Sequence, residues 1–471
     1  MRATTALPLA LCCALASSGK PDELVVPMKP ALLEEPRRVP FPLALPLVPG
    51  EPPRALVATQ KPLARVLEDF PLDLDDDVLL VPLGESRRPL KLKQGRSAVV
   101  EVAWRERAVP VLFWGDQGRW YAAPAAMLTG RAKGHRLELL DTGLDGDFDD
   151  PLDMLAWDDG AWRVLEKEPL VPVFDGLRAL RLEEARRGLE ARLLLEPLPD
   201  GTDEDARRSW RTVNALRNSV ALGPVRLSPE RCAAADAHAA YLQRNAPNGS
   251  RGFNVHDEDP ALPGYTEAGD RAAGGNVGWA SGGRDLGTQP TYEFATLFHR
   301  GEFLYPSLDM GAGQDGGYAV TWVEDSQPDL ARWLNDTGQG SHWVMVPAPG
   351  QTAVPLRALR DSPVPASAPD FYTRSRGWPV SVSTSYRYSD FEDAVLRVYD
   401  EDGEELDGFL FTLADAGFTS PGFPADWLWA AKAPFSSGVT YRASFRATLK
   451  PRVSGREPRE LFFDWTFSTG R

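Results

Sequence analysis

The chain has 471 residues, and this length predicts roughly two to four domains rather than one. Hydrophobic residues make up 43% and charged residues 25%, which excludes a wholly disordered chain. The formal net charge of -15 disfavours a nucleic-acid partner, because an acidic surface repels phosphate backbones.

The N-terminus has the pattern of a secretory signal peptide over residues 1–18. Arg2 precedes an apolar run, and Ala14 and Ala16 form a small-x-small cleavage pattern. We therefore expect a mature chain that starts between residues 17 and 20, in a secreted or cell-envelope protein. Cys12 and Cys13 leave a lipoprotein as the alternative. Because no later run reaches 18 apolar residues, no transmembrane segment is expected.

Two segments follow the signal peptide. Residues 19–63 are rich in proline, which lacks a backbone donor, and this predicts an extended linker. Residues 64–200 contain short runs of β-branched and aromatic residues and predict a β-rich domain of unknown type. The expected strands include Val78–Leu83, Ser97–Trp104 and Val109–Trp114. Residues 177–195 fit either a helix or a charged hairpin.

An acidic loop follows the strand expected at residues 137–140. Oxygen ligands at alternate positions suit Ca²⁺, and this pattern makes a weak calcium site from Asp141, Asp145, Asp147 and Asp149. The loop is not an EF-hand, because Gly143 and Leu152 occupy the third and twelfth positions. The alternative is a solvated acidic turn.

Residues 202–245 have the clearest helical pattern. Thr202 is a candidate cap for a helix with apolar residues three and four positions apart, from Trp210 to Val220. Ser228 followed by Pro229 predicts the start of a second helix. Cys232 lies on its apolar face and is expected to be a small core residue.

Three runs between residues 203 and 342 together resemble the CAP superfamily, the SCP-like extracellular domain, in its bacterial form. They are NALRNSVALGPVRLSPE with the following HAAYL, then HDEDPALPGYTEAG, then HRGEFLYPSLDMGAG. The resemblance implies an α-β-α sandwich. In many members of that family a cavity holds two histidines and two acidic side chains, and some members bind a divalent metal there.

Mapped by motif, His256 and His299 match the two cavity histidines of that family. Gly275 stands where the family has a glutamate, and Glu293 is the nearest acid for a second family block. Glu258, two residues after His256, is our candidate for a missing carboxylate. Neutral imidazole can bind a metal or act as a base, but each histidine could equally be structural. His238 is expected to be structural or on the surface.

Residues 343–471 change to an alternating pattern with short strands separated by proline, glycine and aspartate. This spacing predicts a β-sandwich. The runs VPAPGQTAVP, GWPVSV and FDWTFST resemble a bacterial Ig-like domain of the surface-protein type, which implies a spacer or adhesive module.

The expected fold class is therefore an α+β multidomain protein. It combines a β-rich N-terminal domain, a CAP-like α-β-α sandwich at 203–342 and an Ig-like β-sandwich at 343–471. The expected function is non-enzymatic binding of an unknown extracellular ligand or surface component. The alternative is a metal-assisted hydrolase that uses His256 and His299.

Overall fold

The computed structural model describes most residues from Glu23 to Gly470. The undescribed segments are 1–22, 48–59, 82–88, 165–169, 324–342, 416–424 and 452–456, with shorter gaps of one to four residues. The expected signal peptide and Asp149 lie outside the described residues. In the described part, no helix is both long and apolar enough to cross a membrane.

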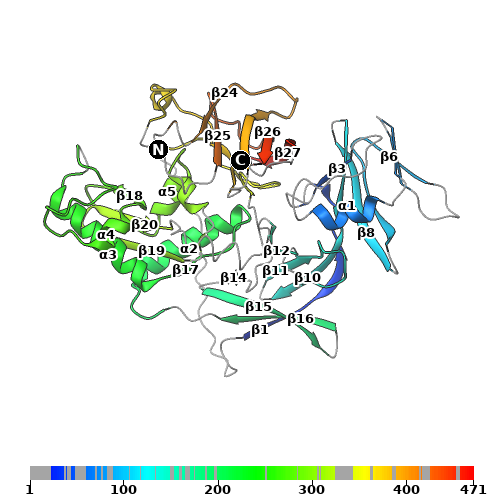
Figure 1. The fold of residues 1–471 in the computed structure, drawn as a ribbon. Helices are drawn as coiled ribbons and strands as arrows, with labels where there is room; N and C mark the ends of the chain where they lie inside the picture. Colours follow the sequence, from blue (N-terminus) through cyan, green and yellow to red (C-terminus); the bar gives the residue numbers. More distant parts are fainter. Residues whose placement is uncertain are drawn as a thin grey trace, which may run out of the picture.

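Two antiparallel sheets enclose the first helix at the blue end of the chain (Figure 1). One sheet has the order β3 (Leu45–Leu47), β9 (Arg119–Pro124), β8 (Arg107–Asp116) and β7 (Ser97–Trp104). The other has β4 (Asp73–Asp75), β5 (Val78–Val81) and β6 (Leu90–Lys93). Together they form a nearly closed seven-stranded arrangement. Helix α1 (Lys61–Glu68) buries Leu63, Val66 and Leu67 in their shared core.

Two further antiparallel sheets follow and share a second core. The five-stranded sheet has the order β13 (Arg163–Val164), β12 (Met154–Trp157), β11 (His135–Leu140), β10 (Ala126–Ala132) and β2 (Lys29–Leu32). The four-stranded sheet has β1 (Glu23–Pro27), β16 (Gly188–Leu195), β15 (Gly176–Ala185) and β14 (Leu170–Val173). Residues 177–195, whose pattern fits either a helix or a charged hairpin, therefore belong to a hairpin of β15 and β16.

The proline-rich segment is paired with these sheets where the structure describes it. Strands β1, β2 and β3 contain Pro27, Pro30 and Pro46, and each lies at the edge of its sheet. The expectation of an unpaired linker is wrong for these stretches. An edge strand tolerates proline, because the missing N–H can face away from the neighbouring strand.

The other α-helices that the structure describes lie between residues 204 and 303. Asp203 caps α2 (Glu204–Ser219), one residue after the expected Thr202, and Ser228 caps α3 (Pro229–Asn245) as expected. Three short helices follow, α4 (Glu267–Ala272), α5 (Gln289–Phe294) and α6 (Arg300–Phe303). The accompanying sheet has the order β17 (Arg226–Leu227), β19 (Asp309–Asp315), β20 (Tyr318–Trp322) and β18 (Asn276–Trp279).

The C-terminal strands form two facing sheets. One sheet has β21 (Trp343–Val346), β22 (Val380–Thr384), β25 (Ala425–Ala431) and β24 (Gly408–Thr412). The other has β23 (Ser389–Tyr399), β26 (Thr440–Pro451) and β27 (Arg459–Ser468). Trp427 and Phe445 meet between them, with ring centroids 4.7 Å apart. The alternating pattern in this segment correctly predicted the strands.

The helical and C-terminal parts share a buried interface. The Arg300 guanidinium donates from Nη1 to the Pro379 carbonyl oxygen at 2.6 Å and lies over the Trp378 ring. Phe303 and Val380 belong to one continuous apolar cluster.

The expected α+β fold class with a CAP-like α-β-α sandwich is wrong. Strands make up 44% of the structure and helices 19%, so the chain is mostly β. After α3, the helices contain only six, six and four residues. Glycine and proline interrupt the sequence here, from Pro263 and Gly264 to Gly274 and Gly275, and do not sustain longer helices.

Candidate functional site

The histidines singled out by sequence lie around the C-terminal half of α3. His238 is fully buried on α3, and Glu258 lies opposite it on the following loop, 2% exposed. His238 Nδ1 lies 2.9 Å from Glu258 Oε1, and Nε2 lies 2.9 Å from the Val255 carbonyl oxygen. Glu258 Oε2 also accepts a hydrogen bond from the Thr266 amide. Glu258 therefore ties the loop to α3 and to the start of α4, and His238 has the expected structural role.

His256 lies next to this buried pair and is itself exposed. Its Nδ1 donates to the Ala273 carbonyl oxygen at 3.0 Å. Desolvation by the surrounding protein lowers the pKa of His256 below 6.5, and the nearby charges of His299 and His238 lower it further. Hydrogen bonds from the imidazole to the backbone of Ala273 and Gly275 oppose this shift. His256 is therefore biased toward the neutral form.

His299, the second histidine that the motif resemblance singled out, is near enough for its charge to lower the pKa of His256. His299 lies at the start of α6, and its carbonyl accepts a hydrogen bond from Asn276 Nδ2 at 3.0 Å. Glu293 is buried on α5, where Gln289 donates to its carboxylate. Of the four predicted cavity residues, His256, Glu258 and Glu293 have side chains that hydrogen-bond to neighbouring backbone or side-chain groups. Among the described residues, no three His, Cys, Asp or Glu side chains gather as a metal site.

The acidic loop uses its carboxylates to hold its own backbone. Asp141 is 3% exposed, and its two oxygens accept hydrogen bonds from the amides of Leu144 and Gly146, at 2.6 and 2.8 Å. Burial raises the pKa of Asp141, and these hydrogen bonds oppose the rise. Asp145 and Asp147 accept from the amides of the residues two and one positions later. The loop thus has the local hydrogen bonding of an ordered acidic turn.

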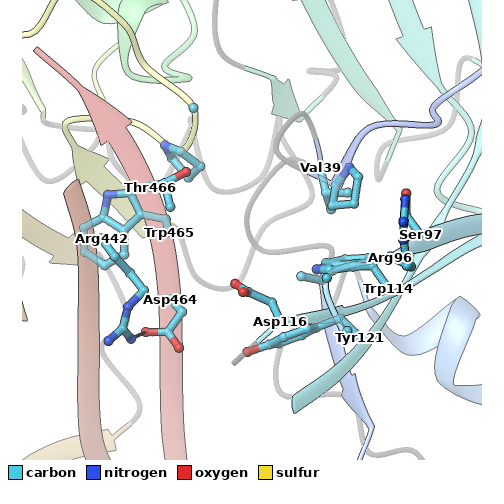
Figure 2. A pocket seen from close by; sticks show the side chains of 16 residues that line it. Val39, Arg96, Ser97, Trp114, Asp116, Tyr121, Arg442, Asp464, Trp465 and Thr466 are labelled. Carbon is cyan, nitrogen blue, oxygen red and sulfur yellow. Dashed lines mark hydrogen bonds and ion pairs between the residues drawn. The ribbon is translucent and has the colours of Figure 1, made fainter. Parts of the chain in front are cut away.

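A pocket that the sequence did not indicate lies where the first sheet meets the C-terminal strands (Figure 2). Its volume is about 370 Å³, within the range of small-molecule sites. Six separate stretches of chain line it: Pro36, Val39, Ala44, Gly95, Arg96, Ser97, Trp114, Gly115, Asp116, Tyr121, Pro349, Gly350, Arg442, Asp464, Trp465 and Thr466.

An aromatic pair forms one wall of this pocket. Trp114 on β8 and Tyr121 on β9 stack with ring centroids 5.3 Å apart. Their polar ends, the indole N–H and the phenol hydroxyl, point toward the β27 side in Figure 2. Neither group makes a hydrogen bond to the residues that the structure describes, and neither atom is among the fully buried polar atoms without a partner. Burial raises the pKa of Tyr121, and the nearby Asp464 raises it further, so the hydroxyl stays protonated at neutral pH.

A charge network forms the opposite wall. Asp464 on β27 accepts hydrogen bonds from Arg442 at 3.3 Å and from Arg119 at 3.2 Å. Burial raises the pKa of Asp464, while the two arginines oppose the rise. Arg442 also lies over the Tyr399 ring. Trp465 donates its indole N–H to the Pro347 carbonyl oxygen, so its hydrogen-bonding group is already occupied.

Comparisons with known proteins give no further guide to this site. No family model, curated protein or solved structure matches the chain.

Proposed function

We propose that this is an exported ligand-binding protein, secreted or held at the cell envelope, that takes up a small molecule between its first sheet and its C-terminal strands. One observation supports this function: Trp114 and Tyr121 direct unpartnered polar ends into a pocket of about 370 Å³. Buried or half-buried polar groups normally have partners, and a bound molecule or ordered water would supply them.

Export rests on the N-terminal sequence pattern. A ligand met outside the cell or at its surface is consistent with that pattern. The proposal does not depend on the resemblance to the CAP superfamily.

A thermal-shift panel on the purified protein tests this function. The probes are neutral mono- and disaccharides, amino acids, dipeptides, nucleosides and sugar acids at millimolar concentration. A compound present at 100 times its Kd stabilises the folded state by about 2.7 kcal/mol, which is measurable as a higher Tm. We expect at least one class of compound to raise the Tm of the wild type. The same compound should raise the Tm of Tyr121→Phe by a smaller amount.

Tyr292→Phe is the matched control, because Tyr292 is exposed on α5, outside the pocket. Its ligand-induced shift should equal that of the wild type. A panel without a stabilising compound, or equal shifts in Tyr121→Phe and wild type, contradicts binding in this pocket.

A further inference from the structure

The charged side chains that line the pocket described above are two of each sign, Arg96 and Arg442 against Asp116 and Asp464. Asp464 lies between Arg442 and Arg119, and its carboxylate pairs with both guanidinium groups. At the rim, Asp116 and Arg96 are exposed and carry opposite charges. A charged ligand would meet a like charge on either wall and would have to compete with an existing ion pair. The electrostatics therefore favour an uncharged molecule.

The pocket groups that make no hydrogen bond within the protein include both donors and acceptors. Trp114 offers a donor, Tyr121 a hydroxyl that can do either, and Asp116 an acceptor. Ser97, also exposed, adds a second hydroxyl at the rim. Ligand hydroxyl groups match such a mixed set, because each can donate one hydrogen bond and accept others.

The rest of the wall is apolar. Val39, Ala44 and Pro349 contribute aliphatic surface beside the aromatic pair. A ligand that fits must therefore have hydroxyls at its edge and C–H groups on its faces. The volume of about 370 Å³ leaves room for one or two sugar rings.

From these features we infer that the pocket binds an uncharged saccharide, of mono- or disaccharide size, with its hydroxyl edge directed at Trp114, Tyr121 and Asp116. This inference rests on the proposed binding function and names its ligand class.

Isothermal titration of the full chain tests the inference. The probes are glucose, cellobiose, maltose and N,N′-diacetylchitobiose, with galacturonate, glucosamine and glycylglycine as anionic, cationic and zwitterionic comparisons. We expect at least one neutral sugar to bind tenfold or more tightly than every charged probe. Tyr121→Phe and Asp116→Asn each remove or weaken one hydrogen bond and should weaken that binding about tenfold.

The matched controls are Tyr292→Phe and Asp402→Asn, which make the same chemical changes at exposed positions outside the pocket. They should leave the affinity unchanged, and circular dichroism checks that all four variants are folded. Tighter binding of a charged or zwitterionic probe overturns the saccharide inference and leaves the binding function standing. Sugar binding that the pocket variants do not weaken overturns the inference as well. If no probe binds and the broader panel is also negative, both proposals fail.

Discussion

Arg119 Nη1 lies 3.2 Å from Asp464 Oδ2, although the two residues are 345 positions apart in the sequence. This ion pair joins β9 to β27, the strands that carry Tyr121 and Trp465 into the pocket. Arg119 also lies over the Phe462 ring, 3.7 Å from its centroid. The pocket thus exists because two distant parts of the chain are held together at this point.

Replacing Arg119 tests how much this junction contributes to stability. The side chain is 38% exposed, so Arg119→Ala should lower the free energy of unfolding by only about 1 kcal/mol. The control is Arg397→Ala, which breaks a more exposed ion pair with Glu405 and should cost less. Urea titrations of both variants measure the difference. A larger loss for Arg397→Ala would show that the junction contributes no special stability.

The buried His238–Glu258 pair should be much more costly to break. His238→Ala leaves a buried carboxylate without its main partner, and we expect a loss of about 3 kcal/mol in unfolding free energy. His135→Ala is the control, because His135 and Asp158 form the same kind of pair with side chains 32% and 44% exposed. It should cost about 1 kcal/mol or less. Equal losses would mean that Glu258 is satisfied without His238.

The pKa of His256 should depend on His299. Because the charge of His299 lowers the pKa of His256, His299→Gln should raise it, as measured by NMR titration of the imidazole protons. His256→Gln assigns the resonance. An unchanged His256 pKa in His299→Gln would show that the two side chains are too far apart to interact.

The lowered pKa of His256 also predicts a pH dependence of stability. The unfolded chain, with a histidine pKa near 6.5, takes up this proton before the folded protein does. The contribution of His256 to stability is therefore complete above pH 6.5 and is lost as the pH falls from 6.5 through the lowered pKa. His256→Gln should lose less stability than wild type in urea titrations between pH 7.5 and 5.5. An identical pH dependence in both proteins would contradict the assignment.

Cys232 should be unreactive in the folded protein. It is 5% exposed on α3, and burial raises its pKa to about 11, so almost no thiolate forms at pH 8. In a chain carrying Cys12→Ser and Cys13→Ser, Ellman's reagent should titrate one thiol in denaturant and almost none under native conditions. Rapid native reaction would show that this face of α3 is open to solvent.

Local patterns in the sequence predicted individual elements well. The strand at Ser97–Trp104 and the cap at Ser228 agree with the structure, because alternation and capping depend on neighbouring residues. The fold class of the chain could not be predicted from the same local patterns. The motifs around His256 and His299 suggested an α-β-α sandwich, whereas glycine and proline keep the intervening helices short.

The pocket could not have been found from the sequence. Trp114 and Tyr121 have the pattern of ordinary strand residues, and nothing near them indicates that Asp464 lies opposite. The ion-pair contact between β9 and β27 depends on how whole sheets pack against each other, which the local pattern does not encode. The proline-rich segment also contributes to the pocket wall, because β3 pairs with β9 beside Tyr121.

Hydrogen exchange with and without the tightest-binding neutral sugar tests the central claim most directly. The account predicts slower amide exchange in two separate peptides, one covering residues 114–121 and the other covering residues 462–466. Both effects should weaken in Tyr121→Phe at the same sugar concentration. Protection confined to residues 254–300, around the histidines, with no change in the two pocket peptides, would contradict the account.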